Sequence, residues 1–503
     1  MKPWIFLLSS LLLFGCQPKK KALVSDPSVR KQGDMGQRLD SLLTPYVRAL
    51  RQATDNTAGL AIGVTKGDSI VYARTFGHAQ LASKKKVDFA TPFHLASVSK
   101  PFSAIAIAKL IQDGKLRLDD PLVDLIPEFQ MQGEGYDKIT IEHILTHTSG
   151  IPRNIAVDDW LHPSFGPKAL EENLDIVKNK ELDFAPGTKF SYSNSAFDIL
   201  GVVISRASGL SFAEYIEQEI FGPIGMDNAS FVKPADISAS HWAMAYSYGL
   251  ETQELSPYPY NERLFPSSGV VASVSDLCKW GQFHVGRGRI GGKQVLAEEW
   301  FDLVVSPKYD TPWGDQIGLS WFLQSYLDRP IIMHTGFDTG FESMMYIYPE
   351  EGISIVVLAN RDFSRTGRII NAVSEILFGQ TAKEYELSAK YLFADAYKKK
   401  GMDHAISLWA DLKKDTTDAY FVDDGDILTT AAILENGGHW HQTKEILDYY
   451  LTINDKSTYA WRLLGNANLH LRDTAAAKSC YRRTLEINPE YEKGRLALEK
   501  LGG

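Results

Sequence analysis

The stretch from Phe93 to Leu122, FHLASVSKPFSAIAIAKLIQDGKLRLDDPL, places a serine and a lysine three residues apart at the start of an apolar segment. The apolar spacing predicts a helix that ends near Gly114, with Ser97 at its N-terminal end and a proline tolerated in the first turn. Free backbone N–H groups and the positive end of the helix dipole can stabilise an oxyanion near Ser97. Lys100 lies on the same face, and burial there can lower its pKa until it acts as a base. The pair is therefore suited to nucleophilic catalysis.

Serine and lysine are common residues, so this pattern is specific only together with other motifs. A second match, Ser83–Lys86, falls in a charged loop and is read as incidental. The chain contains a single Y-x-N pattern, Tyr192-Ser193-Asn194, at the end of a loop and the start of a predicted helix. A tyrosine can relay a proton, and an asparagine can hold a substrate amide and a lysine. Taken alone, the motif is equally a capping asparagine beside a packed tyrosine.

A third motif, His334-Thr335-Gly336, ends a strand predicted at Ile331–His334. Its glycine stands where a substrate backbone could lie close to the chain. By itself this motif is also explained as a simple strand end. The three motifs therefore gain meaning only if the fold brings them together.

The elements that must position these motifs predict an α+β fold. A helical pattern covers Met35–Ala53 and is followed by a hairpin around Lys66–Asp68. Three consecutive strands are predicted within Arg329–Asp362, followed by a helix at Gly367–Phe378. Strands at both ends of a region with helices between them favour one antiparallel sheet closed by the two ends, with a largely helical subdomain over about 95–300. We assign this domain to residues 36–380.

Residues 381–503 change to helix-forming composition without strand signals and predict an all-α domain. Its last part fits the tetratricopeptide (TPR) pattern, with one good repeat and two degenerate copies. The matching positions are Trp461, Leu464, Gly465, Ala477, Tyr481 and Pro489. A plain helical bundle is the alternative. Stacked helix pairs form concave surfaces that bind proteins, so we expect a protein partner of unknown identity here.

The N-terminus, MKPWIFLLSSLLLFGC, has one positive residue, an apolar run too short to span a bilayer, and a glycine before Cys16. This resembles the processing site of bacterial lipoproteins, and an ordinary signal peptide is the alternative. We expect residues 1–16 to be the signal, Cys16 to carry the lipid and residues 17–35 to form a flexible, basic tether. The protein would then be anchored in the bacterial cell envelope by lipid alone.

The overall composition excludes some functions. The 503-residue chain has a net charge of −9 and a pI near 5.8, which argues against nucleic acid as a partner. Cys278 and Cys480 are about 200 residues apart and fall in different predicted domains. We expect no disulfide between them, no metal site and no cofactor.

Together the motifs S-V-S-K, Y-S-N and H-T-G, in this order, resemble the penicillin-recognising serine enzymes. The similarity is to the class C β-lactamase-like group, which includes esterases, D-aminopeptidases and D-alanyl-D-alanine carboxypeptidases. It spans about residues 36–380, and the phrases ILTHTSGIP and SSGVVASVSDLCKWGQF also look like this family. The related class A set is S-x-x-K, S-D-N and K-T-G, and Y-S-N in place of S-D-N points to the class C-like branch. The resemblance implies a β-lactamase/DD-peptidase-like fold.

The resemblance also implies roles for individual residues. Ser97 would be the nucleophile that forms an acyl-enzyme. Lys100 and Tyr192 would form the proton-transfer pair, and the sequence leaves open which takes the first proton. Asn194 would orient the substrate and the lysine. His147, in the THTSG stretch, is read as structural.

The last motif would complete the site. By the same resemblance, His334 and Thr335 would line the far wall, with Gly336 beside them, and bind a substrate carboxylate or carbonyl. The backbone N–H groups of Ser97 and Phe337 would form the oxyanion hole. Dedicated class C β-lactamases have a lysine where this chain has His334, and a histidine is charged only part of the time near neutral pH. Histidine in place of this lysine favours a peptidase or esterase over a dedicated β-lactamase.

The sequence thus predicts a serine hydrolase that acts on ester, amide or D-amino-acid peptide substrates. The alternative is a catalytically inactive, penicillin-binding-like recognition protein that uses its TPR-like region for protein interactions. Retention of Ser97, Lys100, Tyr192 and Asn194 as a complete set favours the enzyme, because a degenerate binder is expected to lose at least one of them.

Overall fold

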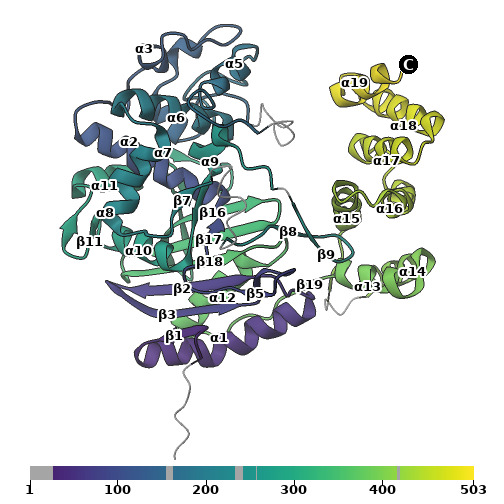
Figure 1. Ribbon diagram of the computed structural model, residues 1–503, viewed down its shortest axis with the longest axis horizontal. Helices are drawn as coiled ribbons and strands as arrows, with labels where there is room; N and C mark the ends of the chain where they lie inside the picture. The colour runs from purple at the N-terminus through teal and green to yellow at the C-terminus, as the bar shows by residue number, and fades with distance from the viewer. Residues whose placement is uncertain (1–25, 154–162, 233–241, 257, 416–419, 503) are drawn as a thin grey trace, which may run out of the picture.

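The computed structural model describes residues 26–153, 163–232, 242–256, 258–415 and 420–502. The predicted signal peptide, Cys16 and most of the predicted tether lie outside the described residues. Figure 1 shows a larger α+β domain with a column of helices from the C-terminal part of the chain beside it. This agrees with the fold class predicted from the sequence.

The larger domain is built on an antiparallel sheet, nine-stranded in the described residues. Its strands, in spatial order, are β1 (Val29–Lys31), β3 (Ser69–Phe76), β2 (Leu60–Lys66), β18 (Ile353–Ala359), β17 (Phe341–Tyr348), β16 (Arg329–Asp338), β15 (Phe322–Tyr326), β14 (Gln316–Ile317) and β13 (Tyr309–Asp310). The register pairs Ile62 of β2 with Val357 of β18. The two ends of the domain therefore meet in the middle of the sheet, as the sequence predicts.

Helices cover both faces of this sheet, and the remaining ones form the largely helical subdomain (Figure 1). They are α1 (Gly33–Ala53), α2 (Lys100–Gln112), α3 (Leu122–Leu125), α4 (Ile141–Leu145), α5 (Glu172–Lys178), α6 (Asn194–Ser208), α7 (Phe212–Ile216), α8 (Gly222–Ile224), α9 (Phe265–Ser268), α10 (Val274–Val285), α11 (Glu298–Val305) and α12 (Thr366–Leu377). Helices α1 and α12 share one apolar core with the sheet, whereas α2, α6 and α10 belong to the core on the other side. One short three-stranded sheet has the order β6 (Phe93–His94), β10 (Val270–Ala272) and β7 (Ser230–Phe231). Short strand pairs complete the domain, namely β4 (His78–Gln80) with β5 (Lys85–Lys86), β8 (Tyr246–Tyr248) with β9 (Thr252–Glu254), and β11 (Arg289–Ile290) with β12 (Lys293–Gln294).

Helix α2 lies at the centre of the second core and is buried on every side. Its sequence, KPFSAIAIAKLIQ, is small or apolar around most of its circumference, as expected for a helix surrounded by protein. Phe102 stacks on Trp280 of α10, with the ring centroids 4.1 Å apart. Because α2 is packed all round, the segment that precedes it has a fixed position.

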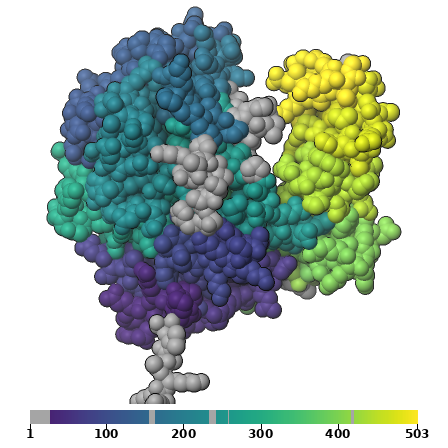
Figure 2. Space-filling view, in the orientation of Figure 1, coloured from purple at the N-terminus to yellow at the C-terminus, as the bar shows by residue number. Residues whose placement is uncertain are grey.

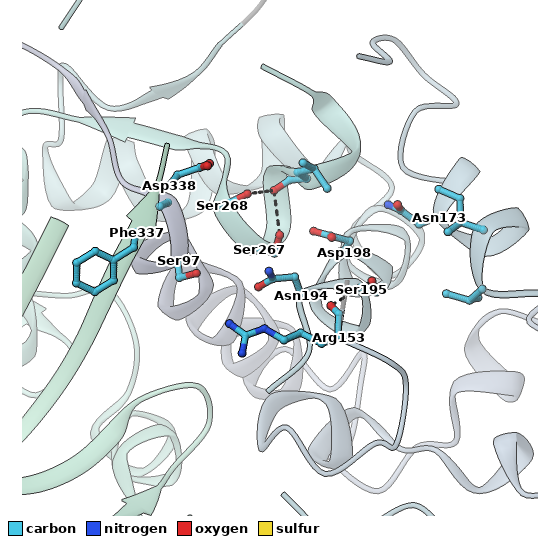
Figure 3. Close-up of a pocket in the computed structure, with 14 residues that line it drawn as sticks. Ser97, Arg153, Asn173, Asn194, Ser195, Asp198, Ser267, Ser268, Phe337 and Asp338 are labelled. Atoms are coloured by element: carbon cyan, nitrogen blue, oxygen red, sulfur yellow. Dashed lines mark hydrogen bonds between the residues drawn. The ribbon is translucent and has the colours of Figure 1, made fainter. Parts of the chain in front are cut away.

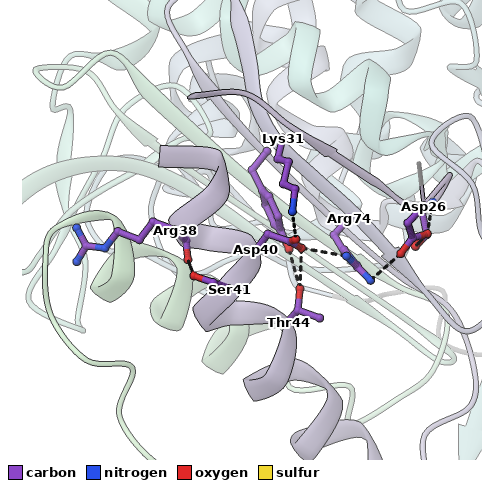
Figure 4. Close-up of polar contacts among 9 residues, drawn as sticks. Asp26, Lys31, Arg38, Asp40, Ser41, Thr44 and Arg74 are labelled. Carbon is purple, nitrogen blue, oxygen red and sulfur yellow. Dashed lines mark hydrogen bonds and ion pairs between the residues drawn. The ribbon is translucent and has the colours of Figure 1, made fainter. Parts of the chain in front are cut away.

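Part of the predicted tether is instead folded. Residues Val29–Lys31 form the edge strand β1, and α1 begins at Gly33. Figure 4 shows the polar contacts that hold this segment: Asp40 of α1 pairs with Lys31 of β1 and Arg74 of β3, and Arg74 also reaches Asp26. The prediction of a flexible tether over 17–35 is thus wrong for its last residues, because ladder hydrogen bonds and these ion pairs fix them.

The C-terminal part consists of paired helices that stack in chain order. They are α13 (Lys390–Lys400), α14 (Met402–Leu412), α15 (Asp424–Asn436), α16 (Trp440–Ile453), α17 (Thr458–His470), α18 (Thr474–Ile487) and α19 (Glu492–Lys500). A short parallel pair, β19 (Leu387–Ser388) with β20 (Tyr420–Phe421), departs from the all-α prediction. Cys278 and Cys480 are both free thiols. Figure 2 shows these helices as a column beside the larger domain.

Within the described ranges, no single helix has the length and apolar character needed to cross a membrane; only the bent pair Asn194–Ser208 and Phe212–Ile224 meets both criteria, and only when taken together.

Candidate active site

The turn that carries Ser97 is strained and tightly held. Ser97 lies in a 3-10 turn, Ala96–Ser99, immediately before α2, rather than in the first turn of the helix itself. Ala96 has a φ of 46°, a left-handed conformation that costs an alanine on the order of 1 kcal/mol or more. The Leu95 N–H donates to the carbonyl of Val270, and the Leu95 carbonyl accepts a hydrogen bond from Ser343. These two hydrogen bonds hold the strained backbone in place, and strained backbone of this kind is common at catalytic residues.

Lys100 begins α2 and points at the serine. Its Nζ lies 3.1 Å from Ser97 Oγ and donates to the Ser267 carbonyl at 2.9 Å. The side chain is fully buried, and this burial lowers its pKa to about 7, although the nearby Asp198 carboxylate acts in the opposite direction. A large fraction of Lys100 is therefore neutral near pH 7, as a base requires.

The Tyr192 ring lies next to the lysine, with Lys100 Nζ 4.8 Å from its centroid. Burial raises the pKa of the phenol, and a hydrogen bond with Ser97 offsets part of this effect. On its other side the ring packs against buried His147 at 4.1 Å, and His147 Nδ1 accepts the Ser193 N–H at 3.2 Å. His147 thus fixes both the ring and the backbone of the Y-S-N motif, which agrees with the structural role predicted for it.

Asn194 is the first residue of α6, and the Ser193 side chain caps this helix by accepting the Ala196 N–H. One turn further on, Asp198 is buried and lines the same cavity as Ser97 and Asn194. Figure 3 shows Asn194 between Ser97 and Asp198. Burial raises the pKa of Asp198, whereas hydrogen bonds with Ser267 and the charge of Lys100 lower it.

Asp198 belongs to the site although no motif in the sequence predicts it. A signal was present: an aspartate within the apolar run AFDILGVVI of a helix needs a buried partner. Its partner, Lys100, comes from a helix about 100 residues earlier in the chain. The pattern within one helix could not reveal this electrostatic pairing.

The third motif lies inside strand β16, which continues to Asp338 and does not end at His334 as predicted. A Cβ atom on Gly336 would overlap the Leu95 carbonyl and the Ser343 hydroxyl, so only glycine allows β16 to pack against the nucleophile turn. Thr335 is half-buried and Phe337 is 61% exposed beside Ser97. The strand therefore borders the serine on the side opposite the Tyr192-Ser193-Asn194 motif.

His334 is buried and uncharged at neutral pH. Burial lowers its pKa to about 3, and the positive charge of Lys100 contributes in the same direction. Its Nδ1 donates to the carbonyl of Thr335 at 2.8 Å, whereas its Nε2 has no hydrogen-bond partner within the described residues. The partial positive charge expected of a histidine near neutral pH is thus absent at this position in the folded protein.

A second residue that sequence reasoning missed is Arg153. It lines both cavities beside Ser97, of about 290 and 390 Å³, with its guanidinium 5.1 Å from the centroid of Tyr192. Its carbonyl accepts the backbone N–H groups of Asn194 and Ser195, so its backbone is fixed to the Y-S-N motif. The guanidinium forms no ion pair with any described residue. A lone arginine after a proline gave no sequence signal for this position.

The structure thus brings Ser97, Lys100, Tyr192 and Asn194 together with the wall that His334, Thr335, Gly336 and Phe337 form. A serine hydroxyl in contact with a near-neutral lysine and a tyrosine is a nucleophile with two proton-transfer partners. This arrangement can carry out acyl transfer through a covalent intermediate.

Comparison with known proteins places this arrangement in a family. A family model described as Beta-lactamase matches residues 43–377, which is more than half of the chain. The chain belongs to the beta-lactamase family. Penicillin-binding protein 4* of Bacillus subtilis (strain 168) is 31% identical over 362 residues, covering 68% of this chain and 76% of that protein. Protein flp of Staphylococcus aureus (strain NCTC 8325 / PS 47) is 27% identical over 332 residues, which cover 66% of this chain but only 64% of that protein.

Two solved structures have a fold similar to that of this chain. An octameric penicillin-binding protein homologue from Pyrococcus abyssi matches with a TM-score of 0.60 and 24% identity, over 73% of this chain and 82% of that one. A beta-lactamase/D-alanine carboxypeptidase from Pseudomonas syringae matches with a TM-score of 0.57 and 21% identity, over 68% of this chain and 98% of that one. At these identities the structural likeness establishes the fold of the beta-lactamase family.

Proposed function

We propose that this protein is a serine hydrolase that forms an acyl-enzyme through Ser97. The observation that carries the proposal is the contact of 3.1 Å between Ser97 Oγ and the buried, near-neutral Lys100. A structural lysine at the protein surface would be fully charged near pH 7 and could not accept a proton. The substrates we propose are esters, amides or D-amino-acid peptides.

Lys100 is the better candidate for the first base. Burial lowers the pKa of Lys100 and raises that of Tyr192, so near pH 7 a neutral amine forms far more readily than a phenolate. Lys100 therefore accepts the Ser97 proton as Oγ attacks the substrate carbonyl. The negative charge on the carbonyl oxygen faces the backbone N–H groups of Ser97 and Phe337.

The leaving group then departs with a proton. The protonated Lys100 supplies that proton through the Tyr192 hydroxyl, which can donate one proton while it accepts another. Collapse of the tetrahedral intermediate breaks the bond to the leaving group and leaves the acyl ester on Ser97. Water repeats the same steps, with the proton passing to Lys100, and releases the acid and the free serine.

The electrostatics of the site favour a peptidase or an esterase over a dedicated β-lactamase. The K-T-G lysine of those enzymes is replaced by the neutral His334, so the permanent positive charge of the site comes from Arg153, on the opposite wall. The names of the relatives include penicillin-binding proteins and a D-alanine carboxypeptidase. A substrate that ends in a carboxylate, such as an acyl-D-amino-acid peptide, is compatible with Arg153.

Intact-mass analysis tests the proposal directly. The protein without residues 1–16 is exposed separately to a fluorophosphonate, a penicillin and a small acyl ester, with Ser97→Ala as the matched control. We expect an adduct on the wild type that is absent from the variant. A folded wild type that forms no adduct with any of the three would contradict the enzyme and favour the inactive recognition protein.

A further inference from the structure

A third cavity, of about 770 Å³, adjoins the catalytic cavities and is lined on another side by the C-terminal helix α15. We call it the distal groove and define it by three walls: residues 337–342 of the β16–β17 hairpin, the segment 362–368 that leads into α12, and the face of α15 that carries Thr429, Ala432, Ile433 and Asn436. Phe337 lines the distal groove and both cavities beside Ser97. Asp338 lines the groove and one of these cavities, so the groove adjoins the space in which a substrate would lie.

The hairpin β8–β9 fixes α15 as a wall of this groove. Gly249 in the turn of the hairpin packs against Ile433, where even a Cβ atom would come within 3.2 Å of its side chain. Leu250 is buried in the core of the C-terminal helices, and Gln253 lies 2.7 Å from the His439 ring just beyond α15. The larger domain thus reaches into the helical part and holds α15 in place.

A second set of contacts holds the segment 362–368. The Lys390 ammonium at the start of α13 sits over the Phe363 ring, and the Tyr391 hydroxyl donates to the Phe363 carbonyl at 3.4 Å. Buried Arg361 donates to the carbonyls of Thr54 and Asp55, both at 3.0 Å. The Lys390 and Tyr391 contacts with the segment, like those of the β8–β9 hairpin with α15, join the two parts of the chain, and the groove has fixed walls.

The chemistry of the walls is that of a peptide-binding groove. The groove is lined by the apolar side chains of Phe337, Phe363 and Ile433 and by the hydrogen-bonding side chains of Thr429 and Asn436. The acidic residues Asp338, Glu342 and Asp362 also line it. Arg365 also lines the groove and forms no ion pair with any residue that the structure describes. A volume of about 770 Å³ lies within the usual range for ligand-binding clefts.

We infer that the distal groove binds the part of the substrate remote from the scissile bond, and that this part is a peptide-like chain with apolar side chains. The C-terminal helices then act as a wall of the substrate site, and α15 confers a preference for long substrates over small esters. This inference rests on the proposed hydrolase function, because the groove is reached from Ser97 past Phe337.

The test compares kcat/KM for a small phenyl ester with kcat/KM for two series of peptidyl thioesters, one lengthened on the acyl side and one on the leaving side. The variant Ala432→Arg places a long, charged side chain in the groove. Ala475→Arg is the matched control, because Ala475 is an exposed alanine on α18 of the same helical part, outside the groove. Circular dichroism checks the fold, and Thr429→Arg is a second variant in the same wall.

We expect the wild type to gain rate with chain length in one of the two series. Ala432→Arg should lower kcat/KM for the longest substrate by about tenfold or more and change that for the phenyl ester by less than about twofold. Ala475→Arg should change neither. The inference is wrong if chain length has no effect on kcat/KM in either series. It is also wrong if Ala432→Arg and Thr429→Arg leave unchanged the ratio of kcat/KM for the longest substrate to kcat/KM for the phenyl ester. Loss of all Ser97 acylation, by contrast, would overturn the proposed function itself.

Discussion

Replacing Asp198 by asparagine gives a direct test of the electrostatics that make Lys100 a base. Asp198 and Lys100 are both buried, and both form a hydrogen bond with Ser267. The negative charge of Asp198 stabilises the ammonium form of Lys100 and so raises its pKa, against the larger effect of burial. The asparagine side chain keeps the size and the hydrogen-bonding capacity of the aspartate but removes this charge. The pKa of Lys100 should therefore fall.

The size of the effect follows from simple electrostatics. Two unit charges about 4 Å apart attract by about 4 kcal/mol at an effective dielectric constant of about 20, which sets an upper limit. The same burial that lowers the pKa of Lys100 raises that of Asp198, so the carboxylate is only partly ionised near pH 7. We therefore expect a shift of roughly one unit in the pKa of Lys100, equivalent to about 1.4 kcal/mol.

The assay is the rate of Ser97 phosphonylation by a fluorophosphonate, in which Oγ bonds to phosphorus and fluoride leaves, between pH 5 and pH 9 with the reagent well below saturation. Lys100 acts as a base only when it is neutral, so in the wild type the rate rises with pH through its pKa of about 7. In Asp198→Asn this rise should move to lower pH by roughly one unit, with little change in the plateau.

The reasoning is refuted if the rise stays at the same pH in the folded variant, or moves to higher pH. Either result would mean that Lys100 is not the titrating base or that Asp198 does not act on it. Asp175→Asn on α5 is the control, because Asp175 is a helix residue that lines none of the cavities beside Ser97. It should leave the pH profile unchanged.

Three further predictions follow from the structure and the sequence. Gly336→Ala should lower the rate of Ser97 acylation at least about tenfold, because its methyl group must displace β16 from the Leu95 carbonyl; the thermal transition, which checks the fold, should still be cooperative. Arg153→Gln should lower kcat/KM about tenfold for an acyl-dipeptide that ends in a carboxylate but little for the matching amide, and an equal loss for both would contradict a role in binding the carboxylate. We also propose that Cys16 anchors the protein in the cell envelope by a lipid, so Cys16→Ser should move the protein from the membrane fraction to the soluble fraction, as seen by immunoblotting of both fractions; an unchanged distribution would contradict the anchor.

Much of the fold could be predicted because local patterns are strong in this chain. The hairpin β2–β3, the three strands β16–β18 and helix α12 follow from alternating apolar residues and turn signals. The residues Val29–Lys31, with the sequence VRK, carry no strand signal. They form β1 only because they pair with the edge of β3 and because Lys31 forms an ion pair with Asp40. Edge strands of this kind depend on partners far away in the sequence.

The sequence by itself determined which chemical groups the protein has: Ser97 and Lys100 at the start of a buried helix, and the Y-S-N and H-T-G motifs in the order typical of the family. These are local patterns, and each depends on the spacing of neighbouring residues. Only the tertiary structure decided whether these groups are ionised, because burial and charges from distant segments set their pKa values. The neutral His334, the near-neutral Lys100 and its buried partner Asp198 arise from segments about 100 or more residues apart. The distal groove is likewise a product of the tertiary structure, because its walls come from two parts of the chain that no local pattern connects.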